Sequence, residues 1–123
     1  MEKGLTVAKY ARRKRVLRRR KIVWLSQALG WQFLKFGEAL PAASCLLIGI
    51  SLDARRDFSF LDVLRARPEL WENQAVCLFH IEKPYILPLP RPVGDTPYLA
   101  VFQAGKRVHI HEGDDAFRFL MRA

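Results

Sequence analysis

The stretch TPYLAVFQAGKRVHIHEG, Thr96–Gly113, contains the clearest fold signal in the chain. Within it, the runs YLAVFQ and KRVHIH are rich in aromatic and β-branched residues, and Ala-Gly separates them with Gly105 at the turn. This pattern predicts a β-hairpin of two antiparallel strands. The segment DDAFRFLMRA, 114–123, then predicts a short helix with two carboxylates near its positive end. This part of the chain is therefore expected to form two strands and a helix.

Two further apolar runs lie before the hairpin in the sequence. CLLIGISL (Cys45–Leu52) and AVCLFHIE (Ala75–Glu82) have the apolar character typical of strands buried on both faces. Between them, DFSFLDVLRARPELWENQ (Asp57–Gln74) repeats apolar residues at helical spacing, which predicts a helix with Asp57 as its N-cap. Two strands joined by a helix imply a parallel crossover, whereas the hairpin adds antiparallel strands. The sequence thus predicts an α/β fold with a mixed sheet flanked by helices.

The N-terminal part of the chain is strongly basic. Residues 4–28 contain no proline and no interior glycine, and they predict a helix that Gly30 would end. Within it, KYARRKRVLRRRK (Lys9–Lys21) holds nine basic residues and no acidic one. The other twelve basic residues are balanced by twelve acidic residues, so the net charge of +9 belongs to this segment. We therefore divide the chain into a basic N-terminal helix or arm, 1–29, and a domain, 30–123.

The apolar residues of the basic helix form only a narrow stripe. Val16, Leu17, Val23 and Trp24 make two pairs seven positions apart and share a side, but basic residues fall on that side as well. This arrangement predicts a helix docked at its C-terminal end, with its basic portion projecting into solvent. A short strand, WQFLKF (Trp31–Phe36), is expected after it.

The uneven charge points to an anionic partner, such as nucleic acid or an anionic surface. Arginine outnumbers lysine in the basic segment by six to three, which favours forked recognition of phosphate. No helix-turn-helix or RNP-type motif accompanies it, so contact with the RNA or DNA backbone is expected instead of sequence readout. Tyr10 and Trp24 are candidates for stacking on bases, although core packing would explain Trp24 equally well. The candidate nucleic-acid-binding residues are Lys9, Arg12, Arg13, Lys14, Arg15, Arg18, Arg19, Arg20 and Lys21.

Four residues around the hairpin carry a resemblance to a known family. Pro97 opens the first hairpin strand, Phe102 precedes Gly105 at the turn, and Gly113 precedes the last helix. Together and in this order they resemble the C-terminal half of a thioredoxin, and the resemblance covers about residues 45–123. It implies a thioredoxin-like mixed sheet flanked by helices, preceded here by the basic N-terminal helix.

The resemblance also implies that redox activity is absent. Thioredoxins carry Trp-Cys-Gly-Pro-Cys where the second strand meets its helix, and this chain has DARRD there, Asp53–Asp57. Ala54 falls at the position of the nucleophilic cysteine and Asp57 at that of the resolving cysteine. Thiol–disulfide exchange needs a thiolate at this point. We therefore expect a redox-inactive protein that is not an enzyme.

A partner groove is the second expectation from the resemblance. In thioredoxin-like proteins the cis-proline loop faces the motif loop, and both contact the extended backbone of a partner. Thr96 and Pro97 would fill the first role, with a cis bond between them, and Arg55 and Arg56 would lie in the second. The two arginines would form an anion or peptide contact; alternatively, they are solvated loop residues.

Other candidate sites are weaker. Cys45 and Cys77 lie 32 positions apart, which suits neither a disulfide framework nor a metal site, so both are expected to be buried. His109 and His111 would share one strand face but lack an obvious third ligand, so neither a metal nor a cofactor is expected. No apolar run reaches the roughly 18 residues of a membrane span. A cytoplasmic location is expected, with an organellar matrix as the alternative because the N-terminal part is rich in arginine.

The resulting functional hypothesis is a non-catalytic thioredoxin-like module that binds nucleic acid through its basic helix. The alternative is a redox-inactive accessory or chaperone protein that binds a partner protein or peptide in the groove beside Pro97. A third reading is peripheral membrane contact, with the arginines on anionic lipid and Ile22–Leu34 in the interface.

Overall fold

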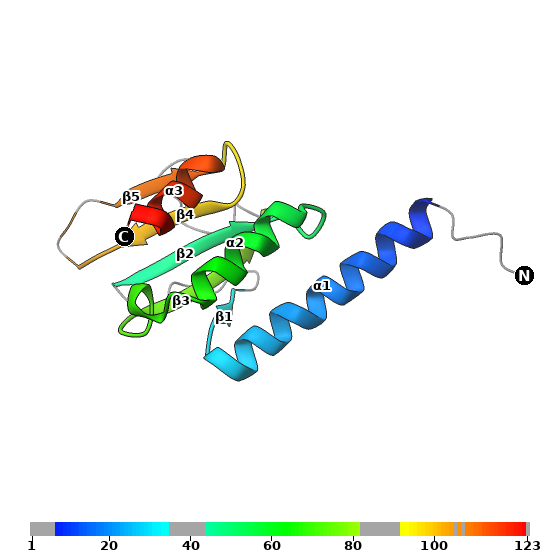
Figure 1. The fold of residues 1–123 in the computed structure, drawn as a ribbon, viewed down its shortest axis with the longest axis horizontal. Helices are drawn as coiled ribbons and strands as arrows, with labels where there is room; N and C mark the ends of the chain where they lie inside the picture. The colour runs from blue at the N-terminus through cyan, green and yellow to red at the C-terminus, as the bar shows by residue number, and fades with distance from the viewer. Residues whose placement is uncertain (1–6, 35–43, 82–91, 105, 107, 123) are drawn as a thin grey trace, which may run out of the picture.

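The computed structural model describes residues 7–34, 44–81, 92–104, 106 and 108–122 (Figure 1). This part of the chain has a mixed α/β fold, with three helices and a five-stranded sheet. In chain order the elements are α1 (Val7–Leu29), β1 (Gln32–Phe33), β2 (Cys45–Ile50), α2 (Arg55–Arg65), a 3-10 turn (Pro68–Leu70), β3 (Ala75–His80), β4 (Tyr98–Phe102), β5 (His109–Glu112) and α3 (Asp114–Arg122). The predicted α/β class and the order of elements are confirmed.

The strands lie side by side in the order β1-β3-β2-β4-β5. The β2–α2–β3 unit is the predicted parallel crossover, with Cys45 opposite Ala75 in the register of its two strands. Strands β4 and β5 form the predicted antiparallel hairpin, in which Tyr98 lies opposite Glu112. Helices α2 and α3 cover one face of the sheet, and α1 runs past the outer side of α2 (Figure 1).

One hydrophobic core joins the three helices to the sheet. Ile48 of β2, Phe60 of α2 and Leu120 of α3 are fully buried in it. Ile22 and Leu25 of α1 belong to the same cluster. Burial of side chains of this size contributes about 1.5–3 kcal/mol each, so α1 is attached by its C-terminal half, as predicted.

The side of α1 that docks was not the side suggested by the sequence. Ile22 and Leu25 face the core, whereas Val16, Leu17 and Trp24 are exposed. The pairs seven positions apart therefore lie on the exposed surface of the helix, although Trp24 also contacts Arg65 of α2. Basic residues that contact Asp53, Leu52 and Asp62 complete the docking side.

Helix α2 begins before the predicted position. Ala54 is its N-cap and Arg55 its first residue, so the assignment of Asp57 as N-cap is wrong. Asp57 lies in the first turn and is fully buried. The reason is that its Oδ2 accepts a hydrogen bond from the Ser51 amide at 2.7 Å, which ties the carboxylate back to the preceding loop. The helix ends at Arg65, ahead of the predicted interruption by proline.

Candidate nucleic-acid interface

Two arginines of the basic segment face the domain instead of solvent. Arg15 donates from Nε to Oδ1 of Asp53 at 2.7 Å, and its Nη2 donates to Oδ2 of the same carboxylate. This hydrogen bond lowers the pKa of Asp53. Arg18 donates to the Leu52 carbonyl oxygen at 2.5 Å, and its guanidinium lies 5.6 Å from the centre of the Phe58 ring. Both arginines therefore hold α1 against the loop that leads into α2.

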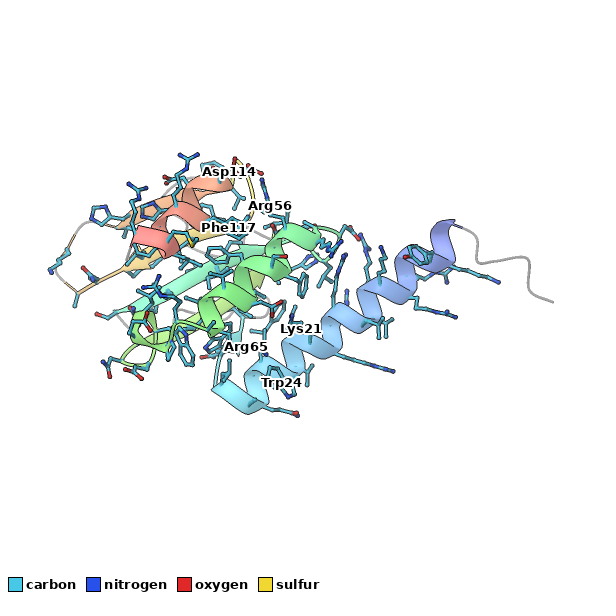
Figure 2. The ribbon with its side chains drawn as sticks, viewed as in Figure 1. Lys21, Trp24, Arg56, Arg65, Asp114 and Phe117 are labelled. Carbon is cyan, nitrogen blue, oxygen red and sulfur yellow. The ribbon has the colours of Figure 1, made fainter. Side chains whose placement is uncertain are left out.

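The same pattern continues along α1 to its contact with α2. Lys21 donates to Oδ1 of Asp62 at 2.6 Å. Trp24 of α1 packs against Arg65 of α2, whose guanidinium lies over its ring, 5.3 Å from the centre (Figure 2). Arg15, Arg18 and Lys21 follow one another at three-residue intervals, which places them on one side of a helix.

The remaining basic residues of the segment lie on the outside of α1. Helix α1 contains no acidic residue to neutralise them. Long side chains stand away from the domain along this helix (Figure 2). A surface of this kind attracts phosphates, and its attraction weakens with salt. The exposed basic residues are Lys9, Arg12, Arg13, Lys14, Arg19 and Arg20.

Large apolar side chains are exposed on the same helix. Trp24 is 47% exposed, so core packing does not account for this residue. Tyr10 is 53% exposed, and the ammonium group of Lys14 lies 4.5 Å from the centre of its ring. The exposed surface of α1 thus combines positive charge with aromatic and aliphatic side chains.

The cis-proline loop lies against the start of α2. The peptide bond between Thr96 and Pro97 is cis, as predicted. Arg56 donates to the Thr96 carbonyl oxygen, contacts both carboxylate oxygens of Asp95 at 3.1 Å, and reaches Oδ1 of Asp114 at 3.3 Å (Figure 2). Arg56 is therefore not a solvated loop residue, because it joins the cis-proline loop and the start of α3 to α2.

The other positions of the expected motif loop differ in character. Arg55 is exposed, and Ala54 contributes no ionisable group. Asp57 is buried, and its Oδ1 has no hydrogen-bond partner among the described residues. Burial raises the pKa of Asp57, against the opposing effects of the Ser51 amide and the Thr96 side chain.

The two cysteines are buried in the sheet, as predicted. Cys45 of β2 and Cys77 of β3 lie in one hydrophobic cluster and are not joined by a disulfide. Burial raises the pKa of Cys45 and raises that of Cys77 to about 12. Because the thiolate is the reactive form, these thiols are poor nucleophiles at neutral pH.

The histidine pair does not form a metal site with other described residues. His109 is exposed, whereas His111 pairs through Nδ1 with Oδ2 of Asp115 at 2.8 Å and stacks on Phe119. Across the described residues, no group of three His, Cys, Asp or Glu side chains is arranged to hold a metal ion. Among the helices described, none combines the length and the apolar character that a bilayer span requires.

The sequence and the structure were also compared with known proteins. No protein-family model, curated protein or solved structure matches this chain.

Proposed function

We propose that this protein is a non-catalytic thioredoxin-like module that binds nucleic acid through the outward side of α1. The observation that carries the proposal is the division of the basic segment. Arg15, Arg18 and Lys21 are used to dock the helix, which leaves exposed arginines in a fixed array on the other side. An array of this kind, without an acidic residue, favours a polyanion over a protein surface of mixed charge.

The size of the array suits a phosphate backbone. Arg12 and Arg20 are eight residues apart, which corresponds to roughly 12 Å along an α-helix. Double-stranded DNA carries one charge per about 1.7 Å of its axis, so several phosphates lie within this distance. Arginine can also contact a phosphate with two parallel hydrogen bonds. The expected binding is therefore electrostatic and largely independent of base sequence.

Two observations support the thioredoxin-like part of the proposal. The cis Thr96–Pro97 loop faces the start of α2, and Arg56 connects them. The position expected for a nucleophilic cysteine is Ala54, and Asp57 is buried at the other motif position. These features support a redox-inactive module, because neither motif position carries a thiol that could perform exchange.

Binding of a partner protein or peptide in the groove is the second candidate function. The cis-proline loop and the exposed Arg55 favour it. However, the Thr96 carbonyl oxygen, which an extended peptide would use, already accepts a hydrogen bond from Arg56. A peptide would have to share this acceptor with Arg56, and we therefore rank groove binding below nucleic-acid binding.

Fluorescence anisotropy with labelled RNA and DNA over a salt series tests the proposal. Substitution is preferable to truncation, because removal of α1 would expose the core around Ile22 and Leu25. The double variant Arg13→Gln/Arg20→Gln is expected to bind at least tenfold more weakly. The slope of log affinity against log salt concentration should be shallower by roughly 1.5. Each lost phosphate contact accounts for about 0.7–0.9, and two arginines are removed.

The matched control is Arg118→Gln/Arg122→Gln, which removes two exposed arginines from α3. It should retain most of the affinity. Absence of binding at low salt would overturn the proposal. Equal losses in the two double variants would do so as well, because they would indicate a response to net charge alone.

A further inference from the structure

The exposed surface of α1 carries an alternating series of apolar and basic residues. Tyr10, Arg13, Leu17, Arg20 and Trp24 succeed each other at intervals of three, four, three and four positions. Residues seven apart on an α-helix differ in direction by only about 20°. Tyr10, Leu17 and Trp24 therefore form one row, here called the apolar row, and Arg13 and Arg20 form an adjacent one, the arginine row. All five side chains are exposed.

This concentration of apolar surface is particular to α1. Of the large apolar side chains exposed in the described part of the chain, all but Met121 lie on this helix. Contact with a phosphate backbone alone would leave the apolar row in water. Exposed apolar surface gathered on one face indicates an interaction site, and the neighbouring arginines favour a partner that combines apolar groups with negative charge.

The order of the rows argues against a membrane as this partner. A helix that lies in a bilayer interface separates an apolar face from a charged one. On α1 the arginine row runs between the apolar row and a second pair of apolar residues, Val16 and Val23. Insertion of both apolar sets would place Arg13 and Arg20 at the deepest point of the helix, where desolvation of their charges is costly.

The two aromatic residues of the apolar row each have a cation over one face of the ring. Lys14 lies 4.5 Å from the ring centre of Tyr10, and Arg65 lies 5.3 Å from that of Trp24. Each ring is still about half exposed. The part of each ring that stays exposed therefore lies next to a positive charge, which matches a base and its adjoining phosphate.

We infer that α1 binds single-stranded nucleic acid, with bases stacked on Tyr10 and Trp24 and phosphates held by Arg13 and Arg20. This inference rests on the proposed nucleic-acid-binding function. Bases in a duplex stack on each other inside the helix, whereas those of a single strand offer their faces to protein side chains. The duplex would use the arginine row alone, so the single strand should bind more tightly at equal salt.

The test uses the full chain with a labelled 20-nucleotide thymidine strand and a 20-base-pair duplex, compared by anisotropy at one salt concentration. The single strand is expected to bind at least about tenfold more tightly. Trp24→Ala should weaken single-strand binding by about tenfold and change duplex binding by less than about twofold. Trp24→Phe should restore most of the loss, because the aromatic face is retained.

Two further variants keep the result interpretable. Val23→Ala removes a neighbouring exposed apolar side chain outside the apolar row and should leave both affinities unchanged. Tyr10→Ala repeats the test at the other end of the row and should act like Trp24→Ala. Thermal unfolding of each variant establishes that the protein is folded.

The failures can be told apart. Equal affinity for the two probes, or single-strand binding unchanged by both Trp24→Ala and Tyr10→Ala, would overturn the inference and leave the proposed function standing. Absence of binding to either probe at low salt would overturn both. Binding to phosphatidylserine vesicles without binding to either probe would also overturn both and identify an anionic membrane as the partner.

Discussion

Arg15 and Asp53, which are 38 positions apart in the sequence, form a two-contact ion pair between the basic helix and the loop before α2. The side chains are 42% and 52% exposed, so the pair alone contributes little to stability. The pair matters because it helps to set which side of α1 faces the domain. Arg18 and Lys21 make similar contacts farther along the same side of the helix. Three contacts on one side of α1 fix which basic residues remain on the other side.

The Arg15–Asp53 pair makes a prediction about stability. Arg15→Gln and Asp53→Asn should each lower the free energy of unfolding by about 0.5 kcal/mol, and the double variant should lose little more than either single variant. Urea unfolding of the four proteins of this double-mutant cycle measures the coupling. Additive losses would contradict an interaction between the two side chains.

Asp57 should make stability fall as pH rises. Its pKa is raised by burial, so between its unfolded value of about 3.9 and the raised folded value the native state binds more protons than the unfolded state. Stability contributed by the protonated carboxyl is present below the unfolded pKa and lost as pH rises through the folded pKa. Asn at this position does not titrate. The unfolding free energy of Asp57→Asn should therefore rise relative to that of the unmodified protein as the pH increases.

Asp53 is the control for this experiment, because its contribution to stability should change with pH in the opposite direction. The hydrogen bond from Arg15 lowers its pKa, so its contribution is present above the unfolded pKa and lost as pH falls through the folded value. Asp53→Asn should consequently become less harmful in acid. Urea midpoints from pH 3 to pH 8 measure both variants, and parallel curves for the two would refute the assignment.

The attachment of α1 can be tested with two neighbouring residues. Leu25 is buried in the core, and Leu25→Ala should cost about 2–5 kcal/mol. Val23 is 54% exposed, and Val23→Ala should change stability by less than about 0.5 kcal/mol. Similar small effects in denaturant unfolding would show that α1 does not share the core in solution.

Arg55 and Arg56 offer a similar comparison at the start of α2. Arg56→Ala removes contacts to Thr96, Asp95 and Asp114 and should lower stability by about 1 kcal/mol, since the side chains are largely exposed. Arg55→Ala should have an effect within about 0.5 kcal/mol. Thermal unfolding of the two variants measures the difference, and a greater loss for Arg55→Ala would count against the observed role of Arg56.

The proposed thioredoxin-like alignment has a chemical test. A protein with both Ala54→Cys and Asp57→Cys should form a reversible disulfide and exchange it with a small dithiol, since the thiols would lie at the start of a helix. Thiol titration of the oxidised and reduced protein provides the measurement. A folded double variant without exchange would be inconsistent with the alignment. Ala54→Ser with Asp57→Cys is the control that lacks the attacking thiol.

Local patterns predicted much of this fold. The hairpin before α3 and the crossover around α2 follow from residue spacings within short segments, and the cis Thr96–Pro97 bond was expected from the resemblance. The division of the basic segment could not be predicted in this way. Arg13 and Arg15 are chemically identical and point in different directions on any helix, but which of the two faces the domain depends on Asp53, far along the chain. The predicted N-cap role of Asp57 was wrong for a similar reason, because its carboxylate accepts a hydrogen bond from the Ser51 amide, which lies outside the helix.

The burial of Leu25 and the contacts of Arg15 also bear on the entropy of binding. A detached peptide with this many like charges would be a marginal helix, since repulsion between neighbouring turns opposes its formation. In this protein the domain holds the helix in shape before any ligand arrives, so binding should not have to be coupled to folding. Association should therefore leave the helical circular dichroism unchanged and show the small heat-capacity change of a preorganised surface.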